Sequence, residues 1–130
     1  MAVNLNQFMI QANQPTITFS ELKNLSFVVL TDIGPWQSII QHAIPHAKFF
    51  YQAERDALTE ITKYSDFPYF TTNITAFDAP VTNPTNTDSR VCLPISDASA
   101  QMPIYANFLQ SEQQRVISII DQLITTLSAI

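Results

Sequence analysis

The sequence of 130 residues contains one glycine, Gly34, and this scarcity excludes several common active-site loops. A Walker phosphate-binding loop, a GxGxxG dinucleotide-binding turn and a GxSxG nucleophile elbow each need two or more glycines. In each, the backbone must approach a phosphate closely or adopt a positive φ angle. The turns of this chain must instead use proline, asparagine, aspartate and serine, as in "DIGPW", "TNPTNTDS" and "SDAS".

Cysteine and histidine are also scarce. Cys92 is the only cysteine, so no disulfide can form within one chain, and its apolar surroundings, "VCLPI", are typical of an inert core thiol. His42 and His46 are four residues apart, but Pro45 interrupts the helix that would bring both rings onto one face. We therefore predict no metal site, no cofactor and no enzymatic activity.

Charge is sparse as well. Charged residues make up 13% of the chain, about half of the roughly 25% that is usual in soluble domains. The net charge is -5 and the six basic residues are scattered, so the charge pattern itself does not indicate nucleic acid binding. Uncharged polar residues take their place, and a surface of this kind repels other copies of the chain only weakly. It suits close packing of many copies.

Long apolar runs are missing. No stretch approaches the ~20 apolar residues of a membrane-spanning helix, and the first residues lack the basic and apolar regions of a secretory signal. We therefore expect no membrane partner and synthesis in the cytoplasm. With 46% apolar residues the chain can form a core, and its length favours a single domain over residues 1–130.

The residues that are present predict an α+β fold. Short runs rich in β-branched and aromatic residues at 8–10 and 16–19 predict an N-terminal β-hairpin. Further strands of a small antiparallel sheet are predicted at residues 27–31, 69–77 and 91–95. Between them, apolar residues recur every three or four positions, which predicts a central helical segment over about 35–64 that is interrupted at Pro45.

The end of the chain predicts a long helix over about 112–128. Its apolar residues leave only a narrow polar stripe, which is more apolar surface than a helix on the outside of a domain needs. Either the helix is buried on two sides within one chain, or it forms an interface between subunits. We favour the interface, because so short a chain has few layers to cover the helix. The residues expected at this interface are Val116, Ile120, Leu123, Ile124 and Leu127.

Several stretches resemble the coat proteins of RNA bacteriophages. "MAVNLNQFMIQANQPTITF" is similar to the N-terminal hairpin of that family, and "YFTTNITAF", "RVCLPIS" and "MPIYANF" are similar to its later strands. "SEQQRVISIIDQLITTL" then resembles the first coat helix. The resemblance implies a dimer that assembles into an icosahedral shell and binds RNA on an exposed sheet face. The residues expected to face RNA are Thr71, Asn73, Thr75, Lys63 and Arg90.

A second resemblance is to the coat proteins of rod-shaped plant viruses. It rests on "FVVLTDIGPWQSII" followed by "KFFYQAERDALTEI", a strand that leads into paired helices. Both resemblances imply a structural, self-assembling protein of a virion, assembled in the host cytoplasm, with other copies of itself and RNA as partners. The alternative is a small acidic binding protein that inhibits a partner, since its net negative charge would complement a basic surface.

Overall fold

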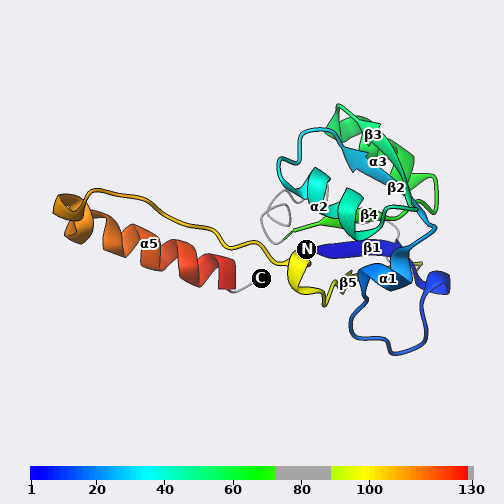
Figure 1. Cartoon of the computed structure of the whole chain (residues 1–130), viewed down its shortest axis with the longest axis horizontal. Helices are drawn as coiled ribbons and strands as arrows, with labels where there is room; N and C mark the ends of the chain where they lie inside the picture. Colours follow the sequence, from blue (N-terminus) through cyan, green and yellow to red (C-terminus); the bar gives the residue numbers. More distant parts are fainter. Residues whose placement is uncertain (73–88, 129–130) are drawn as a thin grey trace.

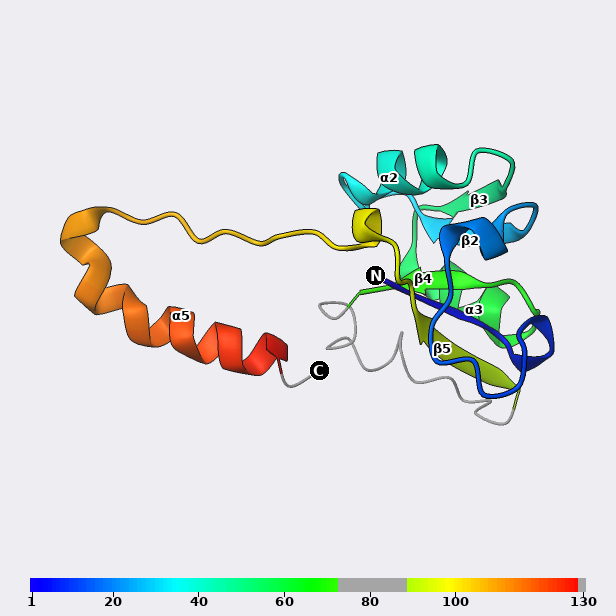
Figure 2. The same ribbon diagram turned by 60° about the horizontal axis from the view of Figure 1, so that its bottom comes forward.

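The computed structural model describes residues 1–72 and 89–128, which form an α+β body and a C-terminal arm that projects from it (Figures 1 and 2). We call residues 1–72 and 89–100 the body, and residues 101–128 the arm. The described elements, in chain order, are β1 (Ala2–Asn6), η1 (Gln7–Met9), α1 (Phe19–Leu22), β2 (Ser26–Leu30), α2 (Trp36–Ala43), β3 (Lys48–Gln52), α3 (Arg55–Lys63), β4 (Tyr69–Thr71), β5 (Arg90–Pro94), η3 (Ala98–Ala100), η4 (Gln110–Glu112) and α5 (Gln113–Ser128).

The sheet of the body is built around β1. Within the described residues β1 lies between β4 and β5 and is antiparallel to both, so the predicted antiparallel sheet is confirmed. β2 and β3 form a separate parallel pair that α2 connects, so the strand predicted at 27–31 exists but is not part of the antiparallel sheet. The backbone N–H of Val28 in β2 donates to the carbonyl of Pro68, at 3.1 Å, which holds the parallel pair beside β4. The antiparallel sheet and the β2–β3 pair therefore form nearly one continuous layer of strands in the body.

The apolar core lies on one side of this layer. Val3 and Leu5 of β1 face it, and Phe27 of β2 stacks on Phe70 with ring centroids 4.7 Å apart. Asn4 and Asn6, which alternate with these residues, are also buried, on the opposite face of β1. β1 is thus covered on both faces. The other residues buried in the core are Ile17, Phe19, Leu22, Val29, Ile40, Ile44, Leu93, Ile95 and Ala100.

The predicted N-terminal hairpin does not form. Residues 7–9 make the turn η1, because the Asn6 side chain accepts a hydrogen bond from the Phe8 N–H and caps it, which leaves Phe8 84% exposed. Thr18 likewise caps α1 by accepting from the Glu21 N–H. Only Ile17 of the second expected strand pairs, in parallel with Ile95. Polar caps at these positions outweigh the β propensity of the residues that follow them.

The predicted central helical segment, 35–64, is two helices separated by a strand. α2 ends at Ala43, before Pro45, as expected. Lys48–Gln52 then forms β3 instead of the start of a second helix, since its backbone hydrogen-bonds in register with β2. The second predicted helix forms only over Arg55–Lys63, as α3. Pairing with a buried strand has overridden the local periodicity.

The turns place asparagine, as well as the single glycine, at positions with a positive φ angle. Gly34 has φ +56° just before α2, and asparagine occupies two further left-handed positions, Asn13 at φ 63° and Asn24 at φ 70°. Asparagine tolerates this conformation better than other residues with a Cβ. The expectation that asparagine would serve in place of glycine in turns is confirmed at these two sites.

Candidate functional sites on the arm and the sheet

The arm leaves the body at a residue that is held in place by burial and hydrogen bonds. Ala100, the last residue of the body, is fully buried, and its carbonyl accepts a 2.8 Å hydrogen bond from the amino group of Met1. The backbone N–H of Ile95 donates to the carbonyl of Met1, which ties the same point to the sheet. Burial lowers the pKa of the Met1 amine from its usual value near 8.0. The point at which the arm leaves the body is therefore fixed by these contacts.

Beyond Ala100 the chain is extended and, apart from the half-buried Met102, exposed as far as Leu109. In both views it leads away from the body and turns at η4, and α5 then runs back toward the body (Figures 1 and 2). Large hydrophobic side chains along this extended stretch face solvent: Ile104, Tyr105, Phe108 and Leu109. An extended segment of this kind has no covering layer of its own.

The helix α5 is uncovered along its length. None of its residues from Gln113 to Leu127 is buried. Leu123 and Ile124, two of the predicted interface residues, are more than half exposed, and Val116, Ile120 and Leu127 are partly exposed. Within the part of the chain that the structure describes, the helix is therefore not buried on two sides, which was the first of the two alternatives. The five predicted interface residues remain available to a partner.

This helix is poorly suited to stand alone. It has 16 residues, and seven of them are valine, isoleucine or threonine, which lose side-chain freedom in a helix. An isolated helix of about this length is marginal in water even when it is rich in alanine. Among the residues described, one ion pair involves this helix. It joins Arg115 to Glu112 of the preceding turn at 3.0 Å, and it is largely exposed to solvent. Packing against another surface must supply most of its stability.

The structure separates the residues expected to face RNA. Thr71 lies opposite Ala2 on β1, whereas Arg90 lies opposite Asn6, four residues further along the same strand. At ~3.3 Å per residue this places them about 13 Å apart along the sheet. Lys63 is exposed at the end of α3 and lines a shallow hollow together with Arg90. Asn73 and Thr75 lie outside the described residues.

Arg90 is occupied within the body. Its Nη1 donates to Asn4 Oδ1 at 3.2 Å, and its Nη2 lies 3.1, 2.6 and 3.1 Å from the carbonyls of Thr62, Ser65 and Phe67. The planar guanidinium thereby ties the chain that follows α3 to the sheet. A phosphate would have to compete with four internal acceptors for this group, so the geometry gives Arg90 a structural role.

Tyr69 lies under the same guanidinium. Arg90 Cζ is 5.6 Å from the centre of the Tyr69 ring, a distance at which a cation and an aromatic face attract. Tyr69 is 4% exposed, and this burial raises the pKa of its hydroxyl, while the positive charge of Arg90 acts in the opposite direction. Arg90 and Tyr69 form one packed unit with the buried asparagines of β1.

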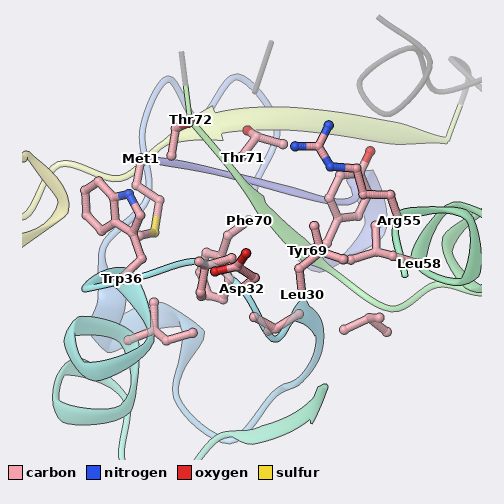
Figure 3. Close-up of a pocket in the computed structure, with 14 residues that line it drawn as sticks. Met1, Leu30, Asp32, Trp36, Arg55, Leu58, Tyr69, Phe70, Thr71 and Thr72 are labelled. Carbon is pink, nitrogen blue, oxygen red and sulfur yellow. The ribbon is translucent and has the colours of Figure 1, made fainter. Parts of the chain in front are cut away.

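Thr71 lies at a different feature, an apolar pocket of about 310 Å³ on the body (Figure 3). Trp36 and Phe70 contribute to its walls, and Arg55 and Thr71 lie at the same side of the pocket in this view. The basic residue that lines the same pocket as Thr71 is therefore Arg55, and not Lys63 or Arg90. Sequence reasoning missed it, because nothing in the local pattern links α3 to β4.

The residues weighed for chemistry lie apart. Cys92 is exposed, not buried as expected, because it points away from the core on β5; its Sγ lies 3.7 Å from Thr71 Oγ1. His42 is in the last turn of α2, with Nδ1 2.7 Å from the Ser38 carbonyl, and His46 lies beyond the helix. Across residues 1–72 and 89–128, no three histidine, cysteine or acidic side chains gather as a metal site would require.

Comparisons with known protein families, curated proteins and solved structures give no match to this chain. Among the described helices, none combines the length and apolar character needed to cross a bilayer.

Proposed function

We propose that this protein is a structural subunit that self-assembles through its C-terminal arm, as a viral coat protein does. The observation that carries the proposal is α5, a helix with seven valine, isoleucine and leucine side chains, none of them buried within the chain. Eight of the thirteen exposed large hydrophobic side chains of the described residues lie in the arm. Apolar surface concentrated in this way marks an interaction site.

The energies favour an interface that covers two arms, one from each copy, over docking of a single arm. The eight arm side chains are 45% to 79% exposed. Burying the exposed half of one such side chain contributes roughly 1 kcal/mol, so one arm offers about 8 kcal/mol. Association costs about 4–15 kcal/mol before any net affinity appears. Two arms, one from each copy, offer about 16 kcal/mol when both are covered, which exceeds that cost.

The surface charge supports assembly of many copies. With 17 charged residues in 130 and a net charge of -5, neighbouring subunits repel one another weakly. Weak contacts repeated over many subunits give a stable assembly without a strong pairwise interface. RNA remains a proposed partner, with Lys63 as the exposed basic residue of the predicted set.

Light scattering after size-exclusion chromatography tests the proposal over a range of protein concentrations. We expect a mass of at least twice the 14.6 kDa of one chain, rising with concentration. Because α5 needs a partner to be stable, the helical signal in far-UV circular dichroism should fall on dilution, while the fluorescence of Trp36 in the body stays constant. Negative-stain microscopy of the concentrated protein should show closed shells or rods.

Each result bears on a separate part of the proposal. Nuclease-protected RNA inside the particles would support RNA as a partner, and particles without RNA would remove it. A monomer at all concentrations, with a helical signal that does not change on dilution, would overturn self-assembly. That result would favour the alternative of a small acidic binding protein.

A further inference from the structure

The apolar residues of α5 follow a pattern that reads the same from either end. Val116, Ile120, Leu123 and Leu127 are spaced by four, three and four residues, so they form one narrow seam along the helix. The sequence of spacings is symmetric about the midpoint between Ile120 and Leu123. A helix with such a seam is complementary to a second copy of itself that runs in the opposite direction.

We propose that α5 pairs with α5 of a second copy as two antiparallel helices related by a two-fold axis at this midpoint. Val116 then lies level with Leu127 of the second copy, and Ile120 level with Leu123. All four layers of the seam are filled by aliphatic side chains. The inference rests on the proposed self-assembly and specifies the surface through which it takes place.

The residues beside the seam fit the same arrangement. On one flank, Ile117 lies close to Ile124 of the second copy, and on the other flank Ile119 lies close to Thr126. Every apolar residue of α5 is covered by this arrangement, including those that are most exposed in the single chain. Ser118 and Thr125 fall on the outer side of the pair and stay in water.

The direction of the helices follows from the shape of the chain. α5 begins far from the body and ends nearer to it (Figures 1 and 2). An antiparallel pair places the two bodies at opposite ends of the helices and opposes their dipoles. A parallel pair would bring both bodies to one end with helix axes about 8–10 Å apart, although a body of this length has a radius of gyration of about 13 Å.

Disulfide cross-linking of the full chain tests the pairing and its direction, in a Cys92→Ser background. Two variants, Val116→Cys and Leu127→Cys, are unfolded together in denaturant, refolded as a mixture at high concentration and gently oxidised. We expect the thiol at position 116 to join the thiol at position 127 of the other chain. Neither variant alone should cross-link, because the two copies of one position lie about 16 Å apart at ~1.5 Å per residue.

A matched control uses Ser118→Cys mixed with Thr125→Cys. These two positions are also level with each other in the proposed pair, but they face outward, so this mixture should give at least tenfold less cross-linked product. Equal cross-linking of the two mixtures would overturn the proposed seam.

Other outcomes separate this inference from the proposed function. Cross-links within each single variant, but not between the two, would show parallel helices and overturn the inference. A chain that is oligomeric by light scattering but does not cross-link in the first mixture would also overturn it, and self-assembly would stand. A chain that is monomeric throughout would overturn both.

Discussion

The body and the arm use the same kinds of apolar residue in opposite ways. Leu5 of β1 is fully buried, whereas Leu123 of α5 is 54% exposed. In the body, β1 lies between two other strands and is covered on both faces, and no described side chain has a buried polar atom without a hydrogen-bond partner. In the arm, an extended segment and one helix have no second layer among the described residues to pack against.

The difference teaches that composition alone does not determine which part of the chain completes its own core. The body has strands that pair with residues far away in the sequence, so its apolar side chains find partners within the chain. The arm has no such long-range pairing among the described residues, and we propose that other copies of the chain cover it. The body is expected to be stable as a monomer, and the arm only in an assembly.

The largest expected effect comes from charges in the seam of the arm. Ile120→Glu combined with Leu123→Glu would bury four carboxylates in each pair of helices. We expect the dissociation constant to rise by at least about 1,000-fold, roughly 4 kcal/mol, since buried unpaired charges are costly. The mass from light scattering should fall to that of one chain, while the urea unfolding curve of Trp36 in the body stays in place.

The control for this variant carries the same charges on the outer side of the helix. Ser118→Glu combined with Thr125→Glu should change the dissociation constant by less than about tenfold, because both side chains stay in water. If the two double variants weaken association equally, net charge rather than the seam is responsible, and the contrast between body and arm loses its basis in packing.

The second prediction compares the two leucines directly. Leu5→Ala should lower the free energy of unfolding of the body by about 2–5 kcal/mol, because it leaves a cavity in the apolar core. Leu123→Ala should lower it by less than about 0.5 kcal/mol in dilute, monomeric protein. Urea denaturation monitored by Trp36 measures both. A large loss for Leu123→Ala in dilute protein would show that α5 packs on the body.

The third prediction concerns the hydrogen bonds of Arg90. Arg90→Ala leaves three backbone carbonyls and the Asn4 amide oxygen without their donor, so we expect a loss of about 2–3 kcal/mol in the stability of the body. Lys63→Ala, a neighbouring change at an exposed cation, should cost less than about 0.5 kcal/mol. Thermal denaturation of both variants checks this. Equal effects would mean that Arg90 is not held in the body as described.

The sequence predicted the elements that local patterns determine. The helix over 112–128 and the strands at 27–31 and 91–95 were found because their apolar patterns are strong and lack competing signals. The strand at Lys48–Gln52 was missed, because its partner β2 is distant in sequence. The unbroken apolar run "FVVL" in β2 is typical of a buried parallel strand. It is the sequence pattern from which the β2–β3 pair could have been predicted.

The candidate site was predicted in part, for a related reason. The residues proposed for an interface on α5 follow from its own periodicity, and the structure leaves them partly or fully exposed. The residues expected at RNA come from three separate segments, and their meeting depends on the tertiary fold. The structure groups Lys63 with Arg90 and groups Thr71 with Arg55, an arrangement that no local pattern reveals.

The smallest expected effect is an alkaline loss of stability that belongs to the body. Burial raises the pKa of Tyr69 above its ordinary value near 10.0 in the folded state. As pH rises above the ordinary pKa of tyrosine, the unfolded chain releases the Tyr69 proton before the folded chain does, so unfolding becomes more favourable. Urea unfolding followed by Trp36 fluorescence between about pH 8 and 11 should therefore show falling stability above pH ~10. Tyr69→Phe should flatten this decline.

The matched control is Tyr105→Phe in the arm, which also removes one phenol from the chain. The Tyr105 ring is 79% exposed, outside the body, so this substitution should leave the pH profile of body unfolding as it is in the original chain. Tyr69→Phe retains the ring beneath Arg90 and removes only the hydroxyl. Parallel profiles for all three proteins would show that burial of Tyr69 does not couple proton release to folding. A flatter profile for Tyr69→Phe alone would place the coupling in the body, where side chains are covered, and not in the arm.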